Sequence, residues 1–299
     1  MNIKEFLNTV YSYKRVYKNY ISVLFKLYVK RKESLVKDVK LKVILKDGSK
    51  LIVPYGFVTN FVWLKNMENS NISDLKLTND GISFMYKGTR IILDPARYSD
   101  IGLVFFKEEY KFLDVKDRDV IDIGMNIGDS SIYFSVNGAK RVIGLEPYPY
   151  AFSIAEKNIK LNGIKNIIAL NAGYGKDSYI IIDPRKISTA ASTLIPSAKG
   201  KTIPILSLKT LISKYNINNA ALKMDCEGCE YALLEENDEV FNNIEMIQIE
   251  YHYGYDDLVR KLKNCGFDVN YTTPKYVYNP DAEKPKTYVG YIYAKRKVQ

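Results

Sequence analysis

The fold of this chain is decided by residues 119–131, which read DVIDIGMNIGDSS. A short apolar run, residues 120–123, carries an Asp and stops at Gly124, and Gly128 follows four residues later. This pattern predicts a buried parallel strand that runs into a glycine turn and then into a helix. Gly124 would let the chain turn sharply and let a ligand approach the backbone without a Cβ in the way.

A second strand is predicted at residues 141–145, and it is followed by Glu146. An acid at the tip of the second strand of such a sheet can accept both hydroxyls of a ribose. Either feature alone is a weak indication, since Asp122 could be a turn former and Glu146 a surface acid. Together, these features follow the order strand, turn, helix, strand and acid. This order predicts a ligand that contains adenosine.

The charge of the chain is unevenly placed. The 299 residues carry a formal net charge of +10, and residues 1–50 hold 13 Lys and Arg against 4 Asp and Glu. The rest of the chain is therefore close to neutral. A basic segment suggests phosphates, an anionic lipid or an acidic partner, and the simplest alternative is a solvated, lysine-rich face.

The three cysteines are Cys226, Cys229 and Cys265. An odd, low count does not build a disulfide framework, so we expect a reducing, cytoplasmic location. Cys226 and Cys229 form a C-x-x-C, but one histidine and no second pair argue against structural zinc, and no metal is predicted. A thioredoxin-like context is absent, so the thiols are interpreted as small packing residues.

No apolar run reaches about 18 residues, so no membrane span is expected. Residues 3–32 predict one helix with an apolar stripe of 4-3-4-3 spacing. Three interpretations stay open for it: a helix packed on the body of the protein, a helical dimer seam, or a helix on an anionic membrane surface. The stripe consists of Phe6, Val10, Tyr13, Tyr17, Tyr20, Leu24 and Leu27.

The alternating residues 39–46 and 51–53, on either side of Asp47-Gly48, predict a β-hairpin. A second hairpin is predicted at residues 82–86 and 89–93, which turns at Lys87-Gly88. Residues 1–100 are therefore expected to be a basic accessory region of one helix and antiparallel strands, and residues 101–299 the main domain.

From residue 117 onward, strands alternate with helices. The pattern predicts an α/β fold: a seven-stranded, mostly parallel, Rossmann-like sheet with helices on both faces and one antiparallel strand. The strands are expected at 119–123, 141–145, 166–171, 220–224, 244–250, 267–272 and 288–295. The helices are expected at 128–137, 148–162, near 207–214, at 228–235 and at 255–265, with an irregular, β-containing insert at 175–205.

The glycine spacing decides which adenosine ligand is expected. A dinucleotide needs G-x-G-x-x-G, so that its pyrophosphate can sit on the helix N-terminus, and that pattern is absent. S-adenosylmethionine (SAM) has an amino-acid tail instead: Asp122 suits the first-turn acid, Asn126 the tail and Glu146 the ribose. The residues predicted to bind SAM are Asp122, Gly124, Asn126, Gly128, Glu146, Pro147, Tyr148, Asn171, Ala172 and Asp225.

Acidic residues gather where the fourth predicted strand ends, in KMDCEGCE, residues 223–230. Ligands bind at this edge of an open α/β sheet. The fifth strand ends there too, and His252 has the right unperturbed pKa to accept a proton near neutrality. The alternatives are helix-start acids, a structural histidine, or a divalent metal on Asp225 and Glu250. The residues predicted to be catalytic are Asp225 and His252, then Glu227 and Glu250.

The segment from DVIDIG through NIKLNG, residues 119–163, with NAGYG, KMDCEGCE and IEYHYG, resembles the FkbM family of SAM-dependent methyltransferases. The resemblance implies the seven-stranded class I methyltransferase fold and transfer to a hydroxyl oxygen. Enzymes that methylate exocyclic amines often carry an Asn/Asp-Pro-Pro-aromatic block after the fourth strand, and this chain lacks it. We therefore expect O-methylation of a glycan, glycolipid or other small molecule.

Several tyrosines near the C-terminus are candidate stacking faces for sugar rings, although aromatic stripes more often belong to a core. They are tyrosines 251, 253, 255, 271, 276 and 278. Two alternatives to a glycan methyltransferase stay open. One is an RNA methyltransferase that uses the basic N-terminal segment to bind phosphates. The other is a non-catalytic SAM-binding or membrane-associated interaction module.

Overall fold

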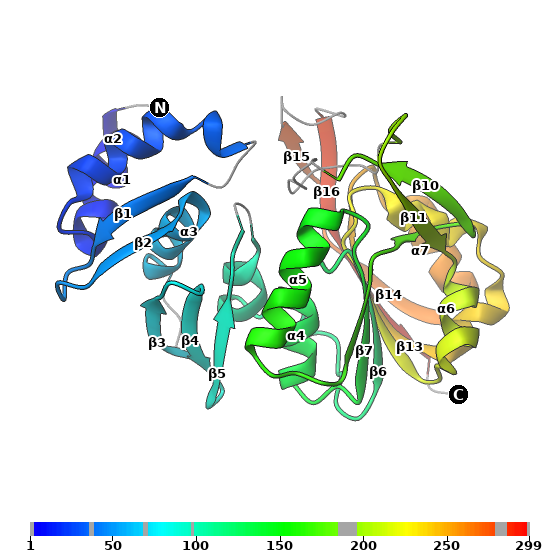
Figure 1. Ribbon diagram of the computed structural model, residues 1–299. Coiled ribbons are helices and arrows are strands. Elements are labelled where there is room, and N and C mark those ends of the chain that lie inside the picture. The colour runs from blue at the N-terminus through cyan, green and yellow to red at the C-terminus, as the bar shows by residue number, and fades with distance from the viewer. Residues whose placement is uncertain are drawn as a thin grey trace. The chain divides into compact units, whose positions relative to one another are not determined.

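The computed structural model describes residues 3–35, 39–67, 71–96, 99–184, 196–278 and 286–297. The chain divides into two compact units (Figure 1). The first consists of Met1–Glu108 and Lys160–Asn162, and the second of Glu109–Ile159 and Gly163–Gln299.

The first unit combines helices with two small antiparallel sheets. Both predicted hairpins are confirmed: β1 (Lys40–Ile44) pairs with β2 (Lys50–Pro54), and β4 (Ile82–Tyr86) with β5 (Thr89–Leu93). The strand β3 (Ile72–Leu77) joins the second hairpin and was not predicted. The helices are α1 (Ile3–Val16), α2 (Tyr20–Lys30), α3 (Tyr55–Lys65), the 3-10 turn η1 (Glu33–Leu35) and the π-helical η2 (Gly102–Phe106).

The prediction of one helix over residues 3–32 is wrong, because the chain breaks between α1 and α2. Tyr17 is fully buried, forms a β-bridge with Leu45, and donates its hydroxyl hydrogen to the carbonyl of Val58. The side-chain oxygen of Asn19 accepts the backbone N–H of Ile44 at 2.8 Å. The backbone N–H of Lys18 donates to the carbonyl of Ile44 in β1 at 2.7 Å instead of to a carbonyl of its own helix, so the stripe is divided between two helices.

The second unit is built on one central sheet with the strand order β14-β16-β13-β12-β6-β7-β8. All neighbouring pairs among β13, β12, β6, β7 and β8 are parallel, and β16 runs antiparallel to both β13 and β14. The predicted fold class is confirmed, and a short strand β15 (Lys275–Tyr278) is added to β16. The strands are β6 (Asp119–Ile123), β7 (Arg141–Leu145), β8 (Ile167–Leu170), β12 (Ala220–Met224), β13 (Ile244–Tyr251), β14 (Phe267–Tyr271) and β16 (Lys286–Arg296).

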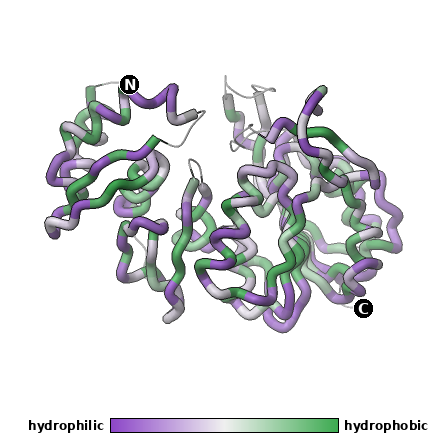
Figure 2. The backbone as a smooth tube through the Cα atoms, in the orientation of Figure 1, coloured by the Kyte–Doolittle hydropathy of each residue, from purple (hydrophilic) through white to green (hydrophobic). Residues whose placement is uncertain are grey.

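Helices cover both faces of this sheet: α4 (Asp129–Val136) and α5 (Pro149–Leu161) on one side, α6 (Leu208–Tyr215) and α7 (Asp256–Asn264) on the other (Figure 1). Strands covered on both faces are apolar in continuous runs, and Figure 2 shows hydrophobic stretches recurring along them. The predicted helix at 228–235 is the 3-10 segment η3 (Cys229–Glu235), which is followed by η4 (Asp238–Asn243). In the insert, β9 (Gly173–Tyr174), β10 (Ser178–Ile182) and β11 (Lys201–Leu206) form a separate sheet. Residues 185–195 of this insert lie outside the described residues.

Candidate active site

The glycine turn after β6 lies directly against the end of β12. Gly124 has φ +77°, and a Cβ placed there would lie 1.9 Å from the backbone oxygen of Asp225. The N–H of Asp225 donates to the carbonyl of Ile123 at 3.1 Å. Gly124 therefore allows the close approach of the chain's own β12 end, which brings the predicted cofactor turn and the acidic edge together.

Asp122 and Lys223 form a buried ion pair beneath this turn. Their carboxylate oxygen and Nζ atom lie 3.1 Å apart, and Lys223 also donates to the carbonyl of Gly124 at 2.7 Å. The hydroxyls of Ser130 and Ser131 donate to Asp122 at 2.7 and 2.6 Å. Burial lowers the pKa of Lys223, but the carboxylates of Asp122 and Asp225 outweigh it and raise this pKa, so the lysine is charged. Asp122 thus stabilises the turn through Lys223 and the two serines. Its contact with SAM stays a prediction.

Glu146 links the tip of β7 to the same turn. Its two carboxylate oxygens accept the backbone N–H groups of Asn126 at 3.0 Å and of Tyr148 at 2.8 Å. Asn126 has φ +47°, which aims its N–H at this carboxylate. Burial raises the pKa of Glu146 to about 8, although the two backbone hydrogen bonds act in the opposite direction. The structure therefore brings Asn126, Glu146 and Tyr148 together, and their contacts with SAM stay predictions.

The predicted cofactor-binding residues Tyr148, Asn171 and Ala172 all take part in the packing and hydrogen bonding of the fold. The side-chain NH₂ of Asn171 donates to the carbonyls of Glu146 and Pro147 at 2.9 and 3.0 Å, and its oxygen accepts from Lys201 at 2.7 Å. The side chain of Tyr148 is buried with Ala151, Ile182 and Ile203, and Ala172 lies in the main core. Asn171 thus holds the loop after β7 in place, and contacts of these three residues with SAM stay predictions.

Asp129, the first residue of α4, was missed by the sequence analysis. Its side chain is buried, and in the part of the chain that the structure describes its Oδ2 atom has no hydrogen-bond partner. Burial raises the pKa of this carboxyl to about 7, partly offset by the charge of Lys223. A buried oxygen that lacks a donor, one residue after Gly128, fits the ammonium group of an amino-acid tail. The sequence does indicate such a role, because an acidic residue is the first residue of the helix after the glycine turn.

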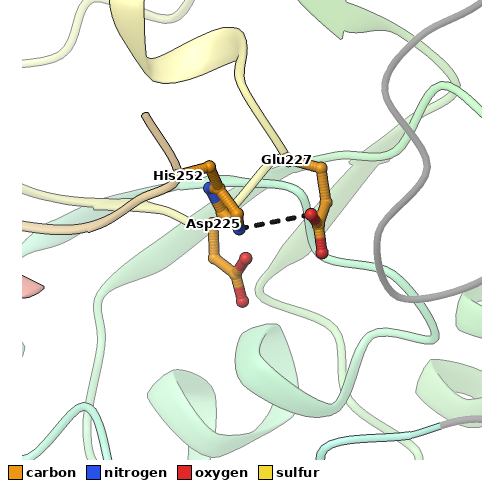
Figure 3. A group of neighbouring side chains, drawn as sticks. All are labelled: Asp225, Glu227 and His252. Atoms are coloured by element: carbon orange, nitrogen blue, oxygen red, sulfur yellow. Dashed lines mark ion pairs between the residues drawn. The ribbon is translucent and has the colours of Figure 1, made fainter. Parts of the chain in front are cut away.

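The acidic edge brings three of the four predicted catalytic residues together. Asp225 and Glu227 follow β12, and His252 follows β13 (Figure 3). One carboxylate oxygen of Glu227 lies 3.2 Å from Nε2 of His252, and the three side chains place one ligand atom each within 4.8 Å of one another. This arrangement can hold a proton or a cation between carboxylates, and the absence of a metal ion stays a prediction.

A fourth residue, Glu230, fixes the imidazole from the other side. Its Oε1 atom lies 3.0 Å from Nδ1 of His252 and accepts the backbone N–H of the same residue at 2.9 Å. Its Oε2 atom accepts the N–H of Gly228 at 2.8 Å. The sequence places Glu230 in the acidic edge but does not predict its pairing with His252, because the pairing depends on β12 and β13 being neighbours.

The pKa of His252 is strongly shifted by these carboxylates. Burial lowers it, but the hydrogen bond and charge of Glu230, with Glu227 and Asp225, outweigh this effect and raise the pKa to about 10. The imidazole is therefore protonated at neutral pH, so the unperturbed pKa on which its predicted role rested does not hold here. Burial, followed by the charge of Asp225, raises the pKa of Glu250 well above its usual range.

Cys226 and Cys229 form a disulfide, so their interpretation as separate packing thiols is wrong. The two residues between them adopt left-handed conformations, Glu227 with φ +58° and Gly228 with φ +115°. This reversal brings the two Cα atoms to 5.5 Å, within the range that a disulfide spans. Cys265 is a free thiol. The cytoplasmic location, which assumed reduced thiols, stays a prediction.

The sheet order, the glycine turn and the buried acid after β7 define a class I methyltransferase domain. Residues 122–269 match the sequence model of the methyltransferase FkbM domain. This segment belongs to that family of SAM-dependent methyltransferases, as its motifs predict, and S-adenosylmethionine is its cofactor.

Two curated relatives are methyltransferases. A putative protein N5-glutamine methyltransferase of Methanocaldococcus jannaschii is 30% identical over 118 residues, which is 37% of this chain and 58% of that protein. A ribosomal protein L11 methyltransferase of Alkaliphilus oremlandii is 26% identical over 154 residues, 50% of this chain and 45% of that protein. The chain thus spans about half the length of these relatives.

Solved structures with a similar arrangement are more distant in sequence. The structure of TYW2 from M. jannaschii in complex with AdoMet is 16% identical, has a TM-score of 0.40, and covers 76% of this chain and 93% of its own. A putative transferase from Pyrococcus horikoshii is 14% identical, with a TM-score of 0.41, and covers 92% of this chain and 100% of its own.

Proposed function

We propose that this protein is an enzyme that transfers the methyl group of SAM to a hydroxyl oxygen of a glycan, glycolipid or other small molecule. The observation that carries the proposal is the position of Asp225, whose backbone touches the glycine turn and whose side chain joins Glu227 and His252. A hydroxyl group has to lose its proton during methyl transfer, and a positioned base accelerates such a step roughly 10²–10⁴-fold.

Asp225 is the proposed base, and the other three candidates have different roles. His252 is already protonated at neutral pH and has no free lone pair. Burial favours the protonated, neutral form of Glu250. Glu227 is held in an ion pair with the imidazolium. Within the described ranges, the carboxylate of Asp225 accepts a long hydrogen bond of 3.4 Å from the hydroxyl of Tyr110, which leaves it able to accept the proton of a bound hydroxyl group.

The other residues of the site act by positioning. SAM, when bound, supplies an electrophilic methyl group on a sulfonium sulfur. Glu146 would accept its ribose hydroxyls and Asp129 its ammonium group, while Glu230 and Glu227 keep the His252 imidazolium in place. Holding two reactants in near-attack geometry can be worth about 7–11 kcal/mol of the barrier.

The β15–β16 hairpin supports an acceptor that contains a sugar ring. The backbone N–H of Tyr288 donates to the carbonyl of His252 at 3.0 Å, so the hairpin adjoins the acidic edge. Tyr276 and Tyr288 are both exposed, and their ring centres are 5.7 Å apart. Aromatic faces of this kind pack well against the apolar faces of sugar rings. Three of the other candidate tyrosines serve the fold, since Tyr251 is buried and Tyr255 stacks on Tyr271 at 4.1 Å.

The names of the relatives suggest protein acceptors, and a basic N-terminal segment suggests RNA. The sequence after β12 argues against a nitrogen acceptor, because it reads Asp-Cys-Glu-Gly in place of the Asn/Asp-Pro-Pro-aromatic block. The concentration of carboxylates at this edge is also unfavourable for an RNA phosphate chain.

The test is to incubate the protein with SAM labelled in its methyl group and with cell extract separated into glycan, lipid, RNA and protein fractions. We expect label in the glycan or lipid fraction, and none with Asp225→Asn. Label in RNA or protein would contradict the proposed acceptor. If no fraction yields S-adenosylhomocysteine, the protein is a non-catalytic SAM-binding module. With an acceptor in hand, Tyr276→Ala/Tyr288→Ala should raise its KM, while the exposed Tyr179→Ala should not.

A further inference from the structure

The first unit exposes large apolar side chains along one side of both N-terminal helices. In each helix they recur at spacings of three and four residues, which places them on one side of that helix. On α1 they are Ile3, Phe6, Leu7 and Tyr11, and on α2 they are Ile21, Phe25, Tyr28 and Val29. More than half of the surface of each of these side chains is accessible to solvent.

These side chains are not the ones that attach the helices to the first unit. The buried residues of α1 are Tyr13 and Val16, and those of α2 are Val23 and Leu27. On α2, Val23 and Leu27 lie about half a turn away from Ile21, Phe25 and Tyr28 at 100° per residue. The helix α2 therefore has one apolar side for the core and a second apolar side that the fold of the unit does not use.

Positive charge surrounds the second apolar side. Residues 3–32 contain eight Lys and Arg and a single acid, Glu5. Lys14, Lys18 and Lys26 are all exposed. Lys18 also lines a shallow hollow at the start of α2, together with Asn19, Tyr20, Ile21, Ser22 and Phe25. Exposed aromatic and aliphatic side chains thus lie among cations that have almost no acidic partners within the same segment.

We propose that α1 and α2 bind the surface of an anionic lipid bilayer. Apolar side chains would enter the boundary between headgroups and acyl chains, and the lysines would contact anionic headgroups. A second copy of the chain fits poorly, because it would oppose two segments of the same strong positive charge. The helices have 14 and 11 residues, and no helix in the described ranges is long and apolar enough to cross a bilayer. Binding at the surface is therefore the geometry that this segment supports.

The test is sedimentation of the full-length protein with vesicles of phosphatidylcholine alone or with 30% phosphatidylglycerol added. We expect binding to the anionic vesicles that weakens in high salt. Ile21→Ser/Tyr28→Ser should reduce the partition constant about tenfold or more, since each loses over 1 kcal/mol of apolar transfer energy. Lys14→Gln/Lys26→Gln should reduce it by a similar factor, at about 1 kcal/mol for each lysine.

The chain offers a matched control in Ile52→Ser/Tyr179→Ser. Ile52 and Tyr179 are 63% and 77% exposed, close to the 69% and 84% of Ile21 and Tyr28. This control should bind vesicles like the wild type. An absence of binding to anionic vesicles, an equal loss with the control, or a dimer that only Ile21→Ser/Tyr28→Ser dissociates would overturn the proposal. The result is independent of the proposed methyl transfer, because none of these residues belongs to the site.

Discussion

Nδ1 of His252 lies 3.0 Å from a carboxylate oxygen of the fully buried Glu230, and Glu227 lies 3.2 Å from the other ring nitrogen. The imidazole is therefore held between two carboxylates, which stabilise its charged form. His252 is the only histidine of the chain. Its ring signals can be followed by NMR in untagged protein without any assignment by mutation.

The first prediction concerns the pKa of His252. A titration followed by NMR should give a value of about 10 in the ligand-free protein. Glu230→Gln should lower this pKa, because it removes the buried charge and the hydrogen bond that raise it. The exposed Glu156→Gln on α5 is the control and should leave the titration unchanged. A wild-type midpoint near the ordinary value of 6.5 would show that the carboxylates do not hold the imidazolium.

The second prediction concerns stability against pH. A histidine whose pKa is raised on folding stabilises the native state fully below its unfolded pKa, near 6.5, and this contribution is lost as pH rises through about 10. His252→Gln should therefore lower Tm most at pH 6 and least at pH 10.5. Thermal unfolding of both proteins at pH 6, 8 and 10.5 measures the difference. A deficit that grows with pH would have the wrong sign.

The third prediction separates the acids of the site. Asp225→Asn should reduce kcat about 10²–10⁴-fold, while the Kd for S-adenosylhomocysteine, measured by calorimetry, changes little. Glu250→Gln should keep activity within a few-fold, because glutamine resembles the neutral form that burial favours. If Asp225→Asn turns over at nearly the wild-type rate while Glu250→Gln does not, the base has been assigned to the wrong residue.

The fourth prediction concerns the Cys226–Cys229 disulfide, which encloses Glu227 and Gly228. Reduction by dithiothreitol should lower kcat about ten- to a hundredfold, because displacement of a site residue by even 1 Å has effects of this size. Cys226→Ser/Cys229→Ser should show the same loss and no further response to reductant, whereas Cys265→Ser should behave like the wild type. Unchanged activity in protein shown by mass spectrometry to be reduced would exclude this role.

The fifth prediction concerns the cofactor turn. At pH 9, above the value of about 8 to which burial raises the pKa of Glu146, Glu146→Gln should weaken S-adenosylhomocysteine binding about tenfold or more, because the amide NH₂ cannot accept a backbone N–H as the carboxylate does and a charged hydrogen bond is worth about 1.5–3 kcal/mol. Asp129→Asn should weaken this binding as well, because the side chain would then carry an NH₂ group, which donates, in place of one of the two carboxylate oxygens, which accept. Calorimetry with Glu156→Gln as the reference measures both. Equal affinity in all three variants would place the ligand elsewhere.

The sheet could be predicted because its strands are locally encoded. Residues 119–123, 141–145 and 220–224 have the predicted bounds, since parallel strands buried on both faces read as continuous apolar runs. The helix α3 could not be predicted, because apolar residues lie all around it and leave no helical period: at 100° per residue, Tyr55 and Trp63 lie opposite Phe57 and Phe61.

The sequence by itself determined the strands of the central sheet, the glycine turn with Glu146, and the resemblance to a methyltransferase family, because each of these depends on residues close together in the chain. Tertiary structure alone decided the break at Tyr17, the partnership of Glu230 with His252, and the raised pKa of that histidine. In each case, the fold brings together residues that lie 20 or more positions apart in the sequence. The burial of these residues and the charges around them therefore depend on which parts of the chain pair with one another. The glycine at position 124 belongs to both groups: its place in the motif was readable, but only the fold shows that it makes room for Asp225.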